Sequence, residues 1–335
     1  MMKTLMLCLG IFALGAQAQA GNFQAKTMRD TLSAREVERG LLLGKGWLEF
    51  GLGTDMKTAN SSWNTDGTIK DWENAQFLYT TERLDIRYGI ARRGEMYWQI
   101  KTHYVRLTNE ALDTDTSQFG LGDPKFGYKW EAFHSVAPVT SLILYGEFKG
   151  PAGNESPGNA VGGPTTFTNF VLTTGTPDLT VGVAGKRQLG PIALSADLAY
   201  IRRFSGAVMY VVETEYHAFN GRIAPGDIKR VHGDVLVQLG PVALNGGALV
   251  QMRDAVRVGS TTDGWFPGSE LTAIENSDGW SVDGITGMTL NVSRGVDLVA
   301  GVTVPVRGED YAFFPIEEIH PSRGNTYSGT IEFRY

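Results

Sequence analysis

The chain ends with Thr326-Tyr-Ser-Gly-Thr-Ile-Glu-Phe-Arg-Tyr335, and this stretch decides the fold class. Its odd-numbered residues are Tyr, Gly, Ile, Phe and Tyr, whereas its even-numbered residues are Thr, Ser, Thr, Glu and Arg. Strict alternation with a period of two predicts a β-strand with one apolar face and one polar face. A tilted strand of about ten residues is also long enough to cross a bilayer.

The same alternation recurs along the chain from residue 47 onward and gives twelve candidate strands. They lie near residues 48–53, 83–90, 96–104, 125–130, 142–149, 178–186, 192–198, 230–237, 242–253, 282–291, 297–304 and 326–335. Their connections alternate in length. The short ones lie near residues 92–94, 134–137, 188–191, 239–241 and 293–295, and the long ones near 57–79, 107–119, 150–177, 205–227, 256–279 and 307–323.

This alternation of short and long connections is typical of an outer-membrane β-barrel with tight periplasmic turns and long external loops. The sequence therefore predicts an all-β fold, a transmembrane antiparallel up-and-down β-barrel of about 12 strands. A closed barrel satisfies every backbone hydrogen bond internally, as lipid requires. The alternative is an exported soluble β-sandwich, which does not explain the Tyr and Trp residues near the strand ends.

The N-terminus predicts export. Residues 1–20 combine Lys3, a short apolar run and alternating small residues up to Ala20, which is typical of a signal peptide cleaved near Ala20. Cys8, the only cysteine, lies inside this leader, so no disulfide is expected. Residues 21–46 are not strand-like and are expected to form a periplasmic extension or a plug, and residues 47–335 the barrel. The predicted location is the outer membrane of a Gram-negative cell.

The overall composition excludes several other classes of protein. The chain has 42 Gly in 335 residues but no G-X-Y period, and its 42% hydrophobic content is too high for a disordered chain. The net charge of −6 with no basic block argues against a nucleic-acid partner. The mean hydropathy of −0.13 excludes a bundle of membrane helices.

The polar faces of the predicted strands point into the lumen and carry acids and bases in similar numbers. Either these charges contact a small-molecule solute, or they pair with one another and fill the interior. The candidates for solute contact are Arg83, Asp85, Arg87, Lys101, His103, Asp123, Lys125, Lys129, Glu147, Arg203, Arg230, His232, Asp234 and Arg253.

Two groups of aromatic residues predict further contacts. The predicted outer loops carry Trp63, Trp72, Phe167, Phe170, Trp265, Phe266, Phe313 and Phe314, which either collect an apolar solute or pack over the barrel mouth. Ile331, Phe333 and Tyr335 resemble the C-terminal insertion signal of bacterial outer-membrane proteins. This resemblance implies recognition by the barrel-assembly machinery. Outer-membrane lipid and lipopolysaccharide are the other expected partners.

The sequence does not predict an enzyme. The five histidines are scattered, and no pair has metal-ligand spacing on one strand, so neither a metal nor a cofactor is expected. There is no G-x-S-x-G elbow and no P-loop.

The segment Phe119-Gly-Leu-Gly-Asp-Pro-Lys-Phe-Gly-Tyr-Lys-Trp130 resembles the Gly-x-Gly-Asp…Lys-Tyr strand of outer-membrane proteins grouped with meta-pathway phenol degradation. Pro124 departs from the apolar residue usual after the Asp. The resemblance implies a channel for passive uptake of small hydrophobic or aromatic solutes. Two alternatives stay open. One is a channel for charged oligosaccharides or other hydrophilic solutes, with Arg83, Arg87, Arg203, Arg230 and Arg253 as a basic track. The other is a structural or adhesive barrel with a closed lumen.

Overall fold

The computed structural model describes residues 35–63, 67–71, 75–109, 114–136, 138–151, 176–211, 218–260, 272–273, 278–293, 295–310 and 322–335. The predicted signal peptide therefore lies outside the described residues. So do Trp72, Phe167, Phe170, Trp265, Phe266, Phe313 and Phe314. Within the described residues, no helix is long and apolar enough to cross a membrane.

The main sheet is a closed antiparallel barrel of 12 strands, which confirms the predicted fold class. Hydrogen bonds between β4 and β5 close the ring. The barrel strands are β1 (Leu48–Ala59), β4 (Ala75–Ala91), β5 (Gly94–Asn109), β6 (Thr114–Leu121) continued by β7 (Lys125–Val136), β8 (Val139–Lys149), β9 (Asp178–Leu189), β10 (Ile192–Arg203), β13 (Ile228–Leu239), β14 (Val242–Arg253), β17 (Gly279–Ser293), β18 (Val296–Asp310) and β20 (Thr326–Arg334).

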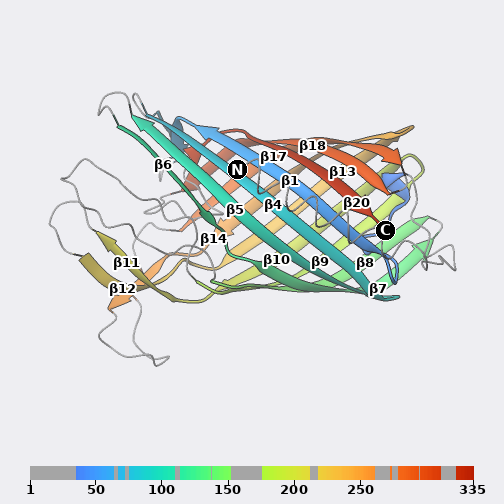
Figure 1. The fold of residues 1–335 in the computed structure, drawn as a ribbon, viewed down its shortest axis with the longest axis horizontal. Coiled ribbons are helices and arrows are strands. Elements are labelled where there is room, and N and C mark those ends of the chain that lie inside the picture. The colour runs from blue at the N-terminus through green and yellow to red at the C-terminus, as the bar shows by residue number, and fades with distance from the viewer. Residues whose placement is uncertain are drawn as a thin grey trace, which may run out of the picture.

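The two ends of the barrel differ, and Figure 1 shows the strands running at a tilt between them. At one end, called here the turn end, short turns such as Gly190–Pro191 and Gly240–Pro241 join consecutive strands. Gly190 and Gly240 adopt positive φ angles of 66° and 62°, which glycine tolerates best. The C-terminus lies at this end, where Leu48 and Tyr335 exchange two backbone hydrogen bonds of 2.8 and 3.0 Å. The opposite end is called the loop end.

Burial alternates along each strand and gives the two faces of the barrel their character. The outward face exposes large apolar side chains such as Leu52, Trp98, Leu198 and Ile331, which suits contact with lipid. The inward face holds most of the buried charged residues, because each second side chain points into the lumen.

The structure corrects the predicted loops, several of which contain strands. A separate three-stranded sheet comprises β2 (Ser61–Trp63), β3 (Ile69–Asp71) and β19 (Ser322–Arg323), so Trp63 lies in a strand rather than in a loop. A four-stranded sheet at the loop end comprises β11 (Gly206–Val211), β12 (Ala218–Ala224), β15 (Arg257–Ser260) and β16 (Thr272–Ala273). Strand β6 also occupies residues 114–119 of a predicted loop. Strand segments that extend beyond the apolar outer surface of the barrel need no apolar face, so the alternation of apolar and polar residues is weaker there.

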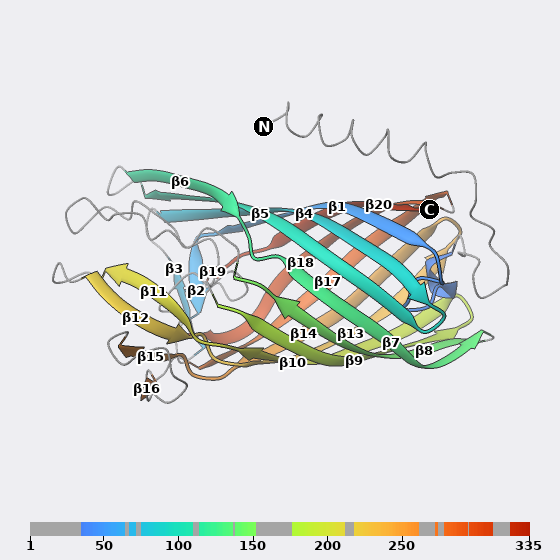
Figure 2. The same ribbon diagram turned by 60° about the horizontal axis from the view of Figure 1, so that its bottom comes forward.

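The wall of the barrel is interrupted where β6 meets β7. Strand β5 pairs first with β6 and then with β7, and residues Gly122–Pro124 form a kink between them. Figure 2 shows the chain leaving β6 through this kink before it continues along β7. The last β7–β8 pair is Lys125 with Lys149. Beyond it, within the described residues, the edge of β6 opposite β5 has no partner strand.

Candidate functional site

The lumen near the turn end is held together by arginine–carboxylate pairs, called here the turn-end network (Glu49, Arg87, Glu95, Asp297 and Arg334). Arg87 on β4 binds Glu49 on β1 and Glu95 on β5, at N–O distances of 2.6 and 2.8 Å. Arg334 on β20 pairs with Glu49 and with Asp297 on β18. Paired and hydrogen-bonded charges of this kind tolerate burial, whereas isolated ones do not.

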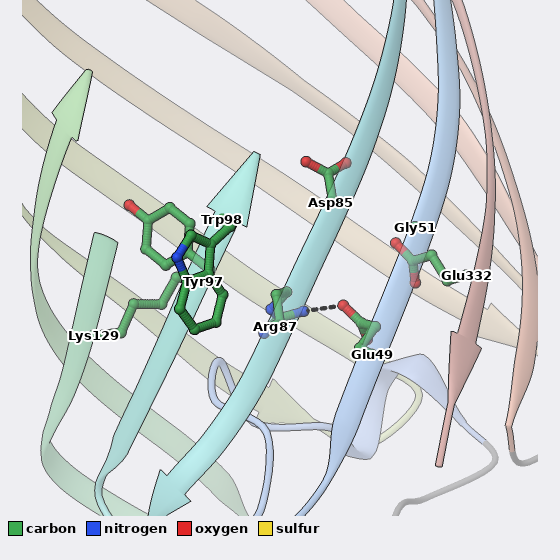
Figure 3. Close-up of a pocket in the computed structure, with 8 residues that line it drawn as sticks. All are labelled: Glu49, Gly51, Asp85, Arg87, Tyr97, Trp98, Lys129 and Glu332. Carbon is green, nitrogen blue, oxygen red and sulfur yellow. Dashed lines mark hydrogen bonds and ion pairs between the residues drawn. The ribbon is translucent and has the colours of Figure 1, made fainter. Parts of the chain in front are cut away.

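A cavity of about 210 Å³ adjoins this network inside the barrel. Figure 3 shows Arg87 bonded to Glu49 at the centre of the cavity wall, with Asp85 farther along the same strand. The other lining residues are Gly51, Tyr97, Trp98, Lys129 and Glu332. Lys129 lies 3.1 Å from Glu95 and 5.0 Å from the centre of the Tyr97 ring. The polar wall therefore presents charges that already have partners.

The segment before β1 folds against the inner wall near the turn end. It contains the 3₁₀-helix η1 (Glu36–Glu38), and Val37 is fully buried. Arg39 pairs with Asp297, and the Leu43 amide donates a 2.7 Å hydrogen bond to Glu95. Farther round the barrel, the Lys186 Nζ donates to the Glu36 carbonyl at 2.8 Å. Residues 36–43 therefore contact side chains from opposite parts of the lumen.

Two inward tyrosines each cross a glycine on the neighbouring strand. The Tyr97 hydroxyl donates to Glu147 at 3.0 Å, and its ring occupies the space where a Gly127 side chain would begin. The Tyr145 hydroxyl donates to Asp197 at 2.8 Å, and its ring lies over Gly182 in the same way. The same acids also meet bases, since Lys125 lies 3.3 Å from Glu147 and Arg230 lies 3.6 Å from Asp197.

Toward the loop end, four buried charges form a second group, the loop-end charge row (Asp123, Lys149, Asp178 and Arg203). Lys149 lies 2.6 Å from Asp178 and 3.6 Å from Asp123, and the Nε atom of Arg203 lies 3.5 Å from Asp178. Each residue is at most 3% exposed. Asp123 belongs to the kink between β6 and β7, so this row adjoins the interruption in the wall.

The predicted lumen residues all occupy inward positions, but the structure does not gather them into one site. Arg87 and Lys129 belong to the turn-end region, and Arg203 and Asp123 to the loop-end charge row. His103 is buried and its Nδ1 lies 2.8 Å from the Tyr79 hydroxyl. The remaining candidates lie between or beside these groups: Arg83, Asp85, Lys101, Lys125, Glu147, Arg230, His232, Asp234 and Arg253. Contact with a solute stays a prediction for all of them.

Sequence reasoning missed Glu95, which is fully buried and meets Arg87, Lys129 and the Leu43 amide. The expected strand began at residue 96, after the short turn. Inward and outward residues alternate along this strand, so the inward position before Tyr97 is Glu95. The sequence therefore contained the signal that Glu95 points inward. The pairing of Tyr97 with Glu147 and of Tyr145 with Asp197 carried no such signal, because the partners lie two strands apart.

Among the described residues, no group of three or more His, Cys, Asp or Glu side chains is arranged to hold a metal ion.

Comparisons with known proteins show the fold. No protein-family model and no curated protein matches the chain. An outer-membrane channel from Pseudomonas putida F1 superposes with a TM-score of 0.64 at 11% identity, covering 90% of this chain and 98% of that one. The match to the KdgM porin covers 85% of this chain and 98% of that one, with a TM-score of 0.41 and 9% identity. The match to the TodX monoaromatic hydrocarbon channel deltaS2 mutant covers 87% of this chain and 89% of that one, with a TM-score of 0.40 and 8% identity. The first of these likenesses shows that the chain shares the barrel fold of that channel.

Proposed function

We propose that this protein is an outer-membrane channel through which small apolar or aromatic solutes diffuse passively. The observation that carries this proposal is that, within the described part of the chain, the barrel wall is interrupted beside β6. A complete wall separates the lumen from lipid, whereas an interrupted one offers an apolar solute a path between them. The apolar outer surface of the barrel supports a location in the membrane.

The outward side chains around the interruption suit such a solute. Phe119 and Leu121 end β6 with 55% and 45% of their surface exposed, and Phe148 is similarly exposed at the end of β8. Apolar solutes gain free energy by leaving water for surfaces of this kind.

The charged lumen supports the same choice over a channel for charged oligosaccharides or other hydrophilic solutes. Arg83 lies 2.8 Å from Asp55 and 3.0 Å from Asp85, and Arg87 is shared by Glu49 and Glu95. Basic side chains that already bind carboxylates attract a passing anion weakly. At Arg83 and Arg87, the predicted basic track therefore consists of arginines that are already paired with carboxylates.

An uptake measurement tests the proposal. Cells lacking their own copy of the protein receive the wild type or the double variant Phe119→Gln/Leu121→Gln, and the fluorescence rise of 1-N-phenylnaphthylamine reports apolar uptake. We expect the double variant to slow this uptake several-fold, because its edge of the interruption is polar.

The matched control is Leu298→Gln/Ile331→Gln, an outward pair with 40% and 41% of the residue surface exposed, on the paired strands β18 and β20. This control should behave as the wild type. Equal uptake with and without the wild-type protein would overturn the channel function. Equal slowing by both double variants would show that the solute does not pass through the wall interruption.

A further inference from the structure

The loop-end charge row contains a cation whose hydrogen-bonding capacity is largely unused. Arg203 is 3% exposed, and its Nη1 and Nη2 atoms have no hydrogen-bond partner among the described residues. Among the described residues, its ion pair is the 3.5 Å contact from Nε to Asp178. A buried guanidinium with so few partners is unfavourable.

The neighbouring acids that the structure describes do not hydrogen-bond to the Nη atoms of Arg203. Asp178 is engaged at 2.6 Å by Lys149. Asp227 accepts the Arg203 backbone amide on Oδ1, and on Oδ2 it receives the Tyr200 hydroxyl and the Arg202 guanidinium at 2.5 and 2.6 Å. The free end of Arg203 therefore keeps two adjacent N–H groups, in the planar arrangement that matches the two oxygens of a carboxylate.

Two apolar side chains lie near Arg203 on the inward face, beside the loop-end charge row. Ile201 precedes it by two residues on the same face of β10, and Ile228 lies opposite Ile201 on β13. Both are buried. In such a setting a charge-assisted hydrogen bond is stronger than in water, and apolar ligand atoms gain from contact.

We propose that Arg203 forms a binding site for the carboxylate of a small solute whose remaining part is apolar. The inference rests on the proposed channel function, since it names the class of solute that the channel takes. The carboxylate oxygens accept the Nη1 and Nη2 protons of Arg203, and the apolar body lies against the Ile201 and Ile228 side of the lumen.

Calorimetric titration of the purified protein in detergent tests this site with benzoate, benzyl alcohol and acetate. Benzoate should bind more tightly than either of the others. Arg203→Gln should weaken benzoate binding by about tenfold or more, as loss of a charged hydrogen bond predicts, and leave benzyl alcohol unchanged. Arg203→Lys, which keeps the charge but not the planar fork, should show an intermediate loss and serves if the glutamine variant does not fold.

The matched control is Arg187→Gln, which removes an exposed arginine of β9 and should bind benzoate as the wild type does. Unchanged benzoate binding by Arg203→Gln, or no benzoate binding by the wild type, would overturn the site. Acetate binding as tightly as benzoate would overturn the apolar part of the proposal. Benzoate binding that persists in a protein without apolar uptake would reject the proposed channel function alone.

Discussion

At the scale of single residues, the glycines beneath the two inward tyrosines are tightly constrained positions of the lumen. A Cβ atom at Gly182 would lie 2.3 Å from Cζ of Tyr145. We expect Gly182→Ala to displace the ring, break its hydrogen bond to Asp197 and lower the free energy of unfolding by about 1–3 kcal/mol, the usual cost of overpacking. Denaturant unfolding in detergent micelles measures this change.

The neighbouring strand provides the control for this prediction. At Gly146 the nearest atom to an added Cβ is 3.9 Å away, so Gly146→Ala should leave stability nearly unchanged. Replacing Tyr145 by Leu together with Gly182→Ala should cost less than the sum of the two single changes, because the colliding ring is gone. Additive costs would show that the ring and the glycine do not interact.

At the scale of elements, the segment before β1 is attached to the inner wall by contacts that can be removed without altering a barrel strand. Arg39→Gln removes the ion pair with Asp297, and Leu43→Pro removes the amide that binds Glu95. We expect the double variant to show a larger single-channel conductance in planar bilayers, since residues 36–43 occupy part of the lumen. Lys45→Gln, an exposed change in the same segment, should conduct as the wild type does. Equal conductance of all three proteins would mean that the segment does not obstruct passage.

The elements also show how far the sequence alone could go. Alternation with a period of two predicted the barrel and placed residues such as Arg87 and Arg203 on the inward face, because strand geometry fixes which side each residue takes. It could not predict that Arg87 meets both Glu49 and Glu95, because such pairs depend on the register between strands distant in sequence. It also could not predict β6, whose outer half lies beyond the part of the barrel that requires an apolar face.

At the scale of the whole molecule, the pairing of inward charges determines which ions the lumen favours. Acids and bases that neutralise one another leave little net field along the path. We therefore expect a reversal potential close to zero for the wild-type protein in a KCl gradient. Arg83→Gln leaves Asp55 and Asp85 without their shared cation, so it should move the reversal potential toward that of K⁺. Arg202→Gln changes an outward arginine instead and should leave the value unchanged. Strong anion selectivity of the wild type would contradict this prediction. It would mean that the inward arginines attract anions despite their carboxylate partners. A channel for charged hydrophilic solutes requires such attraction.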